Sequence, residues 1–262
     1  MTTPGANVGA VLFEQHGSIA MLTLSRPNAL NALTWTMYQQ LESHIAHIER
    51  DSTIRVVIMR GDGKAFAAGT DIQQFQGFTR ADGISYERQM EAIIERLYRL
   101  PKPVLAAIHG YAVGAGIILA SACDLRYATA AARFGVPVAR TLGNTLSIRN
   151  YKHLVDAFGA MRTKEMLFTA RLLDADEALS AGYLTEIVEE NHLLEHVMNV
   201  AQSICELAPL TVWSAKEAHR RLNEAETFPP FDDVLARIYE SRDFAEGVRA
   251  HTEKRKPLWT GM

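Results

Sequence analysis

Apolar residues in the N-terminal part of the chain form two kinds of pattern, short runs and longer stripes. Residues 11–13 and 19–24 are apolar runs on either side of residues 16–18, a turn-forming His-Gly-Ser, which is typical of a β-hairpin. Apolar residues then recur every three or four positions over residues 37–48, after Thr34, a residue type that often caps helices. The pattern predicts a hairpin followed by an amphipathic helix.

The same alternation of strand and helix continues to about residue 190. A helix over residues 81–100 ends before Pro101, and another begins with Asp174 and Glu177 at capping-box spacing and ends at Gly182. Short apolar runs predict strands at residues 56–59, 104–108, 125–128 and 185–188. Strands that alternate with helices favour an α/β fold with a partly parallel sheet.

Strand patterns stop beyond about residue 190. The rest of the chain predicts helices, separated by Ala208-Pro209, Pro229-Pro230 and Pro257. The sequence has no repeat of fixed period and no low-complexity tract, so neither a solenoid nor a disordered linker is indicated. We therefore expect a core over residues 1–190 and a helical region over residues 191–262.

Composition narrows the class of protein rather than its activity. The 262 residues are 48% hydrophobic and 22% charged, which is ordinary for a globular protein, and the net charge of −3 disfavours a nucleic-acid or anionic-membrane partner. The two cysteines, Cys123 and Cys205, lie outside any CxxC motif, so neither a disulfide framework nor a zinc ribbon is indicated. The sequence lacks a signal-peptide pattern and a membrane-spanning run, so we expect a cytoplasmic protein.

Two glycine-rich segments follow predicted strands and suggest a binding site built from the main chain. One is GKAFAAGTDI at residues 63–72, and the other is IHGYAVGAG at residues 108–116. Small residues let a ligand approach the backbone closely, and free N–H groups at the start of a helix favour negative charge. Such a site suits a carbonyl oxygen that becomes an oxyanion.

These two segments and four others resemble the crotonase (enoyl-CoA hydratase/isomerase) superfamily. The others are RPNALNAL at residues 26–33, ACD at 122–124, FTAR at 168–171, and EG at 246–247 with EKR at 253–255. All six come in family order, which makes the resemblance far more specific than one glycine loop. It implies an α/β fold, a crotonase-type spiral of ββα units with a helical C-terminal trimerisation region, assembled as a trimer or a dimer of trimers.

The resemblance also implies an acyl-CoA substrate. CoA enters as part of the substrate, so neither a separate cofactor nor a metal is expected. The main-chain N–H groups of Thr70 and Ala115 would form an oxyanion hole that polarises the thioester carbonyl. The residues expected to bind substrate are Asn28, Ala29, Leu30, Ala32, Ala68, Thr70, Asp71, Ile72, Gln73, Tyr111, Gly114, Ala115, Ile118, Pro137 and Val138.

The chain departs from the family at the two glutamates with which hydratases hold and activate water. The first position is Ile118, and the second is Val138, within FGVPV at residues 134–138. Neither side chain can exchange a proton, and an acid–base group typically contributes about a hundred- to ten-thousand-fold to a rate. The sequence therefore predicts a poor hydratase of simple enoyl-CoA substrates.

Replacement acid–base groups are expected near the loop RTLGNTLS, which begins at Arg140. Arg140 could donate to a developing anion or bind a substrate carboxylate, and Asn144 could orient a water; loop residues of both types more often cap helices or pair at the surface. Tyr151 is a weaker candidate. Asp71 and His109 are more readily explained as a helix cap and a hydrogen-bonded structural histidine.

Three functions stay open from the sequence. The favoured one is an enzyme of the enoyl-CoA hydratase/isomerase type whose acid–base groups differ from those of the hydratases. The second is decarboxylation or thioester hydrolysis in the same pocket, and the third is a non-catalytic protein that binds acyl-CoA. The motif HLLEH at residues 192–196 matches a zinc-binding pattern, but its leucines belong to the core stripe of a helix, so no metal site is predicted.

Overall fold

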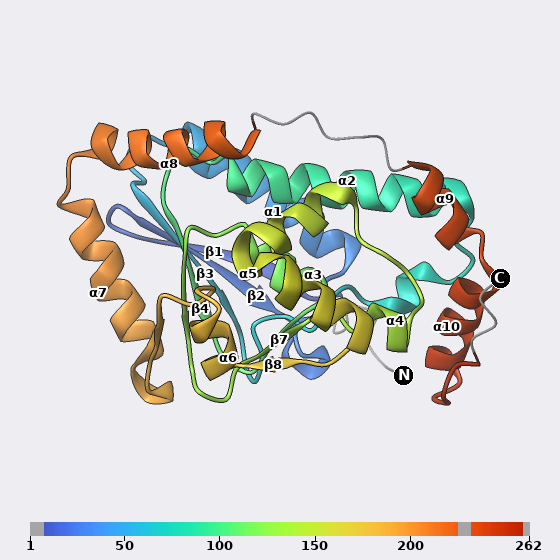
Figure 1. Cartoon of the computed structure of the whole chain (residues 1–262). Helices are drawn as coiled ribbons and strands as arrows, with labels where there is room; N and C mark the ends of the chain where they lie inside the picture. The colour runs from blue at the N-terminus through green and yellow to red at the C-terminus, as the bar shows by residue number, and fades with distance from the viewer. Residues whose placement is uncertain (1–7, 225–231, 259–262) are drawn as a thin grey trace, which may run out of the picture.

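The computed structural model describes residues 8–224 and 232–258 and contains two β-sheets surrounded by helices (Figure 1). The predicted break at Pro229-Pro230 lies outside the described residues. The main sheet consists of β1 (Ala10–His16), β2 (Ile19–Ser25), β3 (Val56–Gly61), β4 (Val104–Ile108), β6 (Leu125–Ala128) and β9 (Glu186–Ile187), in the order β1-β2-β3-β4-β6-β9. The second sheet consists of β5 (Tyr111–Val113), β7 (Arg133–Gly135) and β8 (Leu173–Asp174), in the order β5-β7-β8.

The strands of the main sheet match the predicted apolar runs. β1 and β2 are antiparallel around a turn at Gly17, whose φ of 62° is easy only for glycine, and the later neighbours in this sheet are parallel. In β3, Val56 and Ile58 belong to one buried cluster, and Val57 and Met59 belong to another. Both faces of the sheet are covered, which explains why its strands are continuous apolar runs.

The sequence analysis did not predict the second sheet. Its strands have two or three residues each, which is too short for a periodic pattern. β5 lies within the second glycine-rich segment and pairs in parallel with β7, and β7 pairs antiparallel with β8. This sheet therefore holds the second glycine-rich segment in place through contacts that are distant in sequence.

The helices surround the two sheets, and their ends follow the capping residues. They are α1 (Trp35–Arg50), α2 (Arg80–Tyr98), α3 (Ala115–Ser121), α4 (Val138–Thr141), α5 (Ile148–Thr169), α6 (Ala175–Ser180), α7 (Leu193–Cys205), α8 (Pro209–Glu224), α9 (Asp232–Tyr239) and α10 (Arg242–Thr252), with short 3-10 helices η1 (Pro27–Ala29), η2 (Ile72–Phe75) and η3 (Glu190–His192). Thr34 caps α1, and Asp174 and Glu177 form the capping box of α6, as predicted. The long helix α5, which changes direction at Gly159, was not predicted.

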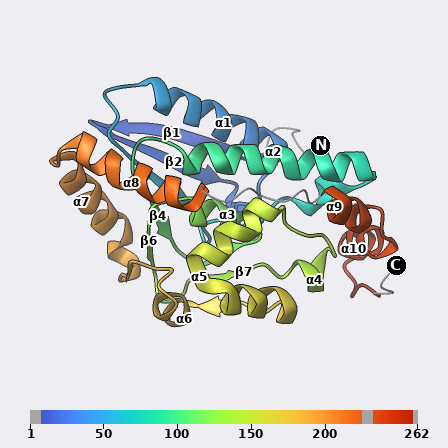
Figure 2. The same ribbon diagram turned by 45° about the horizontal axis from the view of Figure 1, so that its top comes forward.

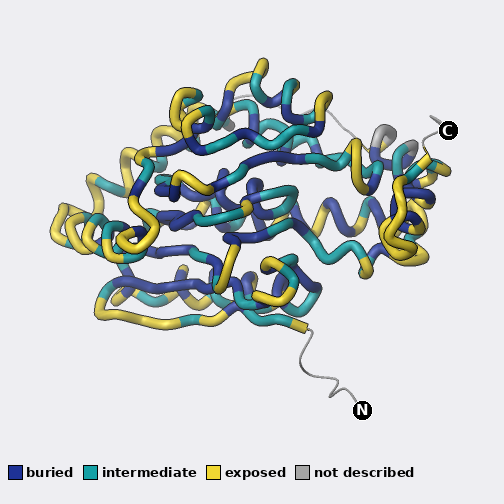
Figure 3. The backbone as a smooth tube through the Cα atoms, turned by 90° about the horizontal axis from the view of Figure 1, so that it is seen from below, coloured by how far each residue is buried: buried dark blue, intermediate teal, exposed yellow. Residues whose placement is uncertain are grey.

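The C-terminal helices lie at opposite ends of the molecule, α7 and α8 at one end and α9 and α10 at the other (Figures 1 and 2). α7 covers one face of the main sheet through buried Val197 and Ala201, and α9 packs against α2. Buried backbone runs through the middle of the molecule, whereas exposed residues lie mainly on its outer turns (Figure 3). The predicted helical C-terminal region is confirmed, and assembly as a trimer or a dimer of trimers stays a prediction.

Candidate active site

The two glycine-rich segments lie side by side. Ala67 and Ala112 form a parallel bridge, in which the N–H of Ala67 donates to the Tyr111 carbonyl (2.9 Å) and the N–H of Val113 donates to the Ala67 carbonyl (3.0 Å). A Cβ added to Gly116 would lie only 2.1 Å from the Ala67 carbonyl oxygen. The segments therefore touch through their main chains, which only small residues allow.

Gly69, the residue before Thr70, lies close to Ala115 at this contact. On the other edge of the first segment, the N–H of Leu33 donates to the Gly69 carbonyl (2.8 Å) and the N–H of Asp71 donates to the Leu33 carbonyl (2.9 Å). Thr70 is the residue that bridges to Leu33 in this parallel pair, so its own N–H points to the opposite edge, toward the second segment. A Cβ added to Gly69 would lie 4.0 Å from the Ala115 nitrogen. Binding of an oxyanion by these two groups stays a prediction.

A cavity of about 240 Å³ lies beside these two N–H groups. The predicted residues that line it are Ala68, Thr70, Ile72, Gly114, Ala115, Ile118, Pro137, Val138 and Asn144. The further lining residues are Gly69, Phe75, Tyr86, Glu87, Met90, Val113, Thr141, Leu142, Thr145, Leu146 and Asn150. Ile118 and Val138 both face this space, so the two positions that hydratases fill with glutamate are apolar parts of the cavity wall.

The other predicted residues are not among the described residues that line the cavity. Arg140 is exposed on α4, and the lining contains no Lys or Arg side chain from the described parts of the chain. The remaining ones are Asn28, Ala29, Leu30, Ala32, Asp71, Gln73 and Tyr111. The N–H of Ala68 donates to the Leu30 carbonyl (2.9 Å), so residues 28–32 run beside the first glycine-rich segment. Their contact with CoA stays a prediction.

Two residues outside the lining have the structural roles expected from the sequence. Asp71 caps η2 by accepting from the N–H of Gln73, and its carboxylate also pairs with Arg26 at 2.9 Å. His109 Nε2 lies 2.9 Å from the Gly63 carbonyl oxygen. Asp71 and His109 therefore both have structural partners, and we assign neither side chain a role in proton transfer.

Among the described residues that line the cavity, one carries a carboxyl group, Glu87 of α2, which the sequence analysis missed. Its side chain is only 3% exposed. One carboxyl oxygen accepts from the Tyr239 hydroxyl of α9 (2.7 Å), and the other accepts from the main-chain N–H of Ser147 (3.1 Å). Burial raises the pKa of Glu87 to about 7, and this effect outweighs the two hydrogen bonds, which lower the pKa. A sequence signal did exist, because Glu87 shares its helical stripe with Met90 and Ile94.

Two asparagines complete a polar side of the cavity. Asn150 is 3% exposed, and its Oδ1 has no hydrogen-bond partner among the described residues. The buried Oδ1 of Asn144 also has none in the described part of the chain, although the Asn144 side chain bonds to the Tyr239 hydroxyl. We call Glu87, Asn144 and Asn150 the polar wall.

Hydroxyl groups fix the side chain of Thr70. Its Oγ1 lies 2.5 Å from the Tyr38 hydroxyl and 2.8 Å from the Tyr86 hydroxyl. Burial raises the pKa of both tyrosines, so both stay protonated at neutral pH. These bonds fix the Thr70 side chain beside the cavity that the residue lines.

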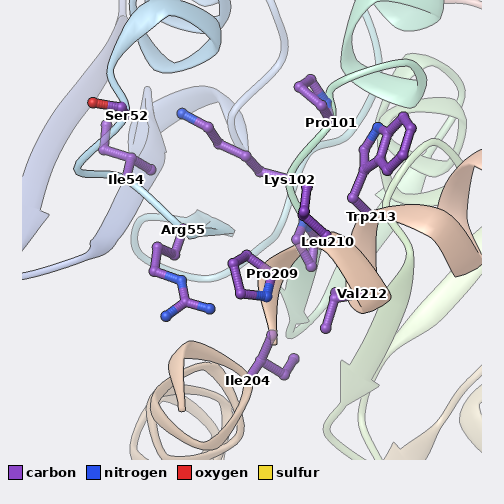
Figure 4. A pocket seen from close by; sticks show the side chains of 11 residues that line it. Ser52, Ile54, Arg55, Pro101, Lys102, Ile204, Pro209, Leu210, Val212 and Trp213 are labelled. Atoms are coloured by element: carbon purple, nitrogen blue, oxygen red, sulfur yellow. The ribbon is translucent and has the colours of Figure 1, made fainter. Parts of the chain in front are cut away.

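A second, larger cavity of about 520 Å³ lies between the starts of β3 and β4 and the helices α7 and α8 (Figure 4). Its lining residues are Ser52, Ile54, Arg55, Pro101, Lys102, Pro103, Ile204, Pro209, Leu210, Val212 and Trp213. Arg55 donates to the Leu207 carbonyl, and Lys102 donates to the carbonyls of Ile48 and Asp51. The lining has no Asp, Glu or His among the described residues, so this cavity offers no acid–base pair.

The zinc-like motif on α7 does not converge on a metal-binding geometry. His192 is exposed and lies 3.5 Å from Glu195, whereas the ring of His196 packs against Tyr127. Over the described ranges, the structure contains no group of three or more His, Cys, Asp or Glu side chains suited to a metal ion. Within those same ranges, no helix is long and apolar enough to cross a membrane.

Comparisons with known proteins agree with the geometry. Residues 14–262 match the family described as enoyl-CoA hydratase/isomerase. The chain is 34% identical to a short-chain-enoyl-CoA hydratase of Clostridium acetobutylicum, over 94% of this chain and 95% of that one. It is 31% identical to an (E)-benzylidenesuccinyl-CoA hydratase of Thauera aromatica, over 96% and 99% of the two chains.

Solved structures also share the fold. A methylmalonyl-CoA decarboxylase in complex with 2-nitronate-propionyl-CoA has a TM-score of 0.88, with 28% identity and coverage of 97% of this chain and 99% of that one. An enoyl-CoA hydratase/carnithine racemase from Magnetospirillum magneticum has a TM-score of 0.79, with 31% identity and coverage of 97% and 98%. The predicted fold class is confirmed, and the chain belongs to the enoyl-CoA hydratase/isomerase family.

Proposed function

We propose that the protein is an enzyme that transforms an acyl-CoA thioester by stabilising its oxyanion or enolate with the N–H groups of Thr70 and Ala115. The approach of these two N–H groups to one cavity carries the proposal. Two fixed N–H donors favour negative charge on a thioester oxygen more strongly than the neutral carbonyl that precedes it. The relatives and the decarboxylase named above are all CoA-ester enzymes by name, which supports this substrate class.

The favoured reaction is a proton transfer on the acyl chain, as in hydration or isomerisation of an enoyl-CoA. Glu87 supports it, because a buried carboxyl group with a pKa of about 7 is suited to take up and release a proton near neutral pH. Ile118 and Val138 cannot supply the pair of carboxylates that hydratases use. The protein is therefore proposed to differ from standard hydratases in where its acid–base group lies.

A second candidate reaction is decarboxylation. The TM-score of 0.88 to a methylmalonyl-CoA decarboxylase favours it, and this reaction needs enolate stabilisation more than a base. The composition of the cavity argues against it, since no Lys or Arg from the described residues is present to bind a substrate carboxylate. Arg140, which the sequence suggested for this role, is exposed outside the cavity.

The proposal is tested by exchange of the C2 hydrogens of butyryl-CoA in D2O, followed by NMR, because exchange requires an enolate. Ala115→Pro removes one N–H at the first position of α3, where proline is tolerated. We expect exchange to fall about a hundredfold or more, corresponding to roughly 3 kcal/mol of lost stabilisation. Ala115→Gly keeps the N–H and is the matched control.

Assays with crotonyl-CoA, methylmalonyl-CoA and butyryl-CoA separate the candidate reactions. Hydration, loss of CO2 and release of free CoA identify a hydratase, a decarboxylase and a hydrolase in turn. Binding of butyryl-CoA with neither C2 exchange nor turnover of any ester would contradict the proposed enzyme and favour a binding protein.

A further inference from the structure

We propose that the polar wall is the subsite for a hydroxyl group at C3 of the acyl chain, or for the water that adds there, with Glu87 exchanging the proton. This inference rests on the proposed function, because it needs the thioester to lie between Thr70 and Ala115. It assigns the substrate class as a 3-hydroxyacyl-CoA and the corresponding enoyl-CoA. Hydratases hold and activate water with two glutamates. Here one glutamate and two asparagines at other positions would have that role.

Glu87 is held in one orientation inside the cavity. Tyr239 donates to one of its oxygens at 2.7 Å and the N–H of Ser147 donates to the other at 3.1 Å, so the carboxyl group cannot rotate freely. Each oxygen still has a second lone pair. A carboxylate fixed in this way can accept a proton from a ligand without losing its two supporting bonds.

The two asparagines leave acceptor atoms that a ligand must satisfy. Asn144 and Asn150 line the cavity, and their Oδ1 atoms are buried and have no partner among the described residues. A buried acceptor without a donor is unfavourable, so the site favours a ligand that carries O–H groups. A carboxylate on the acyl chain has no proton to donate to these acceptors. Its negative charge would also be repelled by the Glu87 carboxylate. The polar wall therefore discriminates in favour of a hydroxyl group and against a negatively charged substituent.

The three members of the polar wall form one connected group. Asn144 bonds to the Tyr239 hydroxyl, which donates to Glu87. Glu87 accepts from Ser147, whose hydroxyl accepts from the N–H of Asn150 at 3.3 Å. These bonds thus connect the Glu87 carboxyl group to the Asn144 side chain and to the main chain of Asn150.

Dehydration by this site balances without any other reactant. The Glu87 carboxylate removes a proton from C2, and the electron pair of the C–H bond moves into the thioester to form an enolate at the two N–H groups. The enolate then forms the C2–C3 double bond and breaks the C3–O bond. The departing hydroxyl takes the proton from Glu87 and leaves as water, which restores the carboxylate; hydration is the reverse.

The first test removes the acid. Glu87→Gln is expected to lower kcat for both crotonyl-CoA hydration and 3-hydroxybutyryl-CoA dehydration by about a hundredfold or more, with KM changed by less than about threefold. Glu91→Gln makes the same change one turn further along α2, outside the described lining, and should change kcat by less than about twofold. A Glu87→Gln enzyme that keeps wild-type turnover would overturn the proposal.

The second test removes an acceptor and identifies its ligand. Asn150→Leu keeps the side-chain volume and removes Oδ1. If the acyl hydroxyl is the ligand, 3-hydroxybutyryl-CoA binds about tenfold more weakly to this variant while butyryl-CoA binding is unchanged. If water is the ligand, binding of both esters is unchanged and the hydration rate falls about tenfold. Unchanged binding together with an unchanged rate would overturn the subsite.

Thermal unfolding shows whether each variant is folded, and Asn144→Leu, in a loop, repeats the second test should Asn150→Leu fail to fold. Failure of the proposed function and failure of the polar subsite give different results. If butyryl-CoA neither binds nor exchanges its C2 hydrogens, the proposed function is wrong. If it binds and exchanges, but crotonyl-CoA and 3-hydroxybutyryl-CoA are not interconverted, only the polar subsite is wrong.

Discussion

The cavity has two sides that are built in different ways. One side is main chain, where the glycine-rich segments lie side by side and Gly69, next to Thr70, approaches Ala115. The other side is the polar wall, where α2, the start of α5 and α9 bring side chains together over sequence separations of 60 and 152 residues. The first side cannot change without disturbing the backbone, whereas the second can be rebuilt by single substitutions. The two sides meet at α2, where Tyr86 bonds to Thr70 Oγ1 (2.8 Å) and the next residue is Glu87.

The largest effect is expected on the main-chain side. In Gly116→Ala the new Cβ would meet the Ala67 carbonyl oxygen at 2.1 Å, so the segments must separate. We expect a loss of about 2–3 kcal/mol in the free energy of unfolding and about a hundredfold in turnover. Denaturant unfolding measures the loss of stability, and the C2 exchange assay measures the loss of turnover.

Gly17→Ala is the matched control for that change. Gly17 has a positive φ, which Gly116 of α3 does not, but no atom lies within 4 Å of its added Cβ. We expect it to lower stability by about 1 kcal/mol and to leave exchange unchanged. Equal losses of stability and of exchange in the two variants would contradict a specific effect of the contact between the segments.

Glu87→Gln is expected to stabilise the protein in alkaline solution. The carboxyl group has a pKa of about 7 in the folded protein and about 4.5 as its ordinary value, so the folded state binds the proton more tightly. Stability from this group is present below pH 4.5 and lost as the pH rises through 7. Above pH 7 the free energy of unfolding of the variant should exceed that of the wild type by on the order of 3 kcal/mol. At pH 4.5 the two free energies should be almost equal.

Urea unfolding at a series of pH values measures this gain. Titratable groups that act on Glu87 are Tyr239 of α9 and Glu91 of α2, and Glu91 raises its pKa. Glu91→Gln should therefore show only a small part of the gain in the free energy of unfolding above pH 7. A pH-independent difference between wild type and Glu87→Gln would contradict a buried, titrating carboxyl group.

Tyr239→Phe should have a smaller effect, through Glu87. Removing the hydroxyl removes a hydrogen bond that lowers the pKa of Glu87, so that pKa should rise by about one unit. We expect kcat to fall about tenfold at pH 7 and to recover partly at higher pH, as the carboxylate forms. A purely structural role would lower kcat equally across the pH–rate profile.

Arg140→Ala should have the smallest effect. The side chain is exposed and is not among the described residues that line the cavity. We expect kcat/KM for crotonyl-CoA to change by less than about twofold. A larger loss would restore the sequence-based hypothesis that Arg140 acts on the substrate.

The sequence predicted the main sheet and the main-chain side because both depend on local patterns. Apolar runs located all six strands of the main sheet, whereas the resemblance to the crotonase superfamily implied the roles of Thr70 and Ala115, which stay a prediction. The short strands of the second sheet and the kinked helix α5 have no such pattern. Glu87 was missed because its partners Ser147 and Tyr239 are distant in sequence, although its place on the buried stripe of α2 was detectable. Arg140 was proposed from chemical type alone, and type does not indicate which way a loop side chain points.

Tyr239 follows Glu87 by 152 residues, yet it completes a group on α2 that is synthesised much earlier. All strands of the main sheet and both glycine-rich segments precede α9 in the chain, so we expect them to be able to form before α9 is synthesised. Until then, the Glu87 carboxyl group lacks its hydroxyl donor. We therefore expect the acid–base side of the cavity to mature last, so that a partly made chain could bind a thioester before it could turn one over.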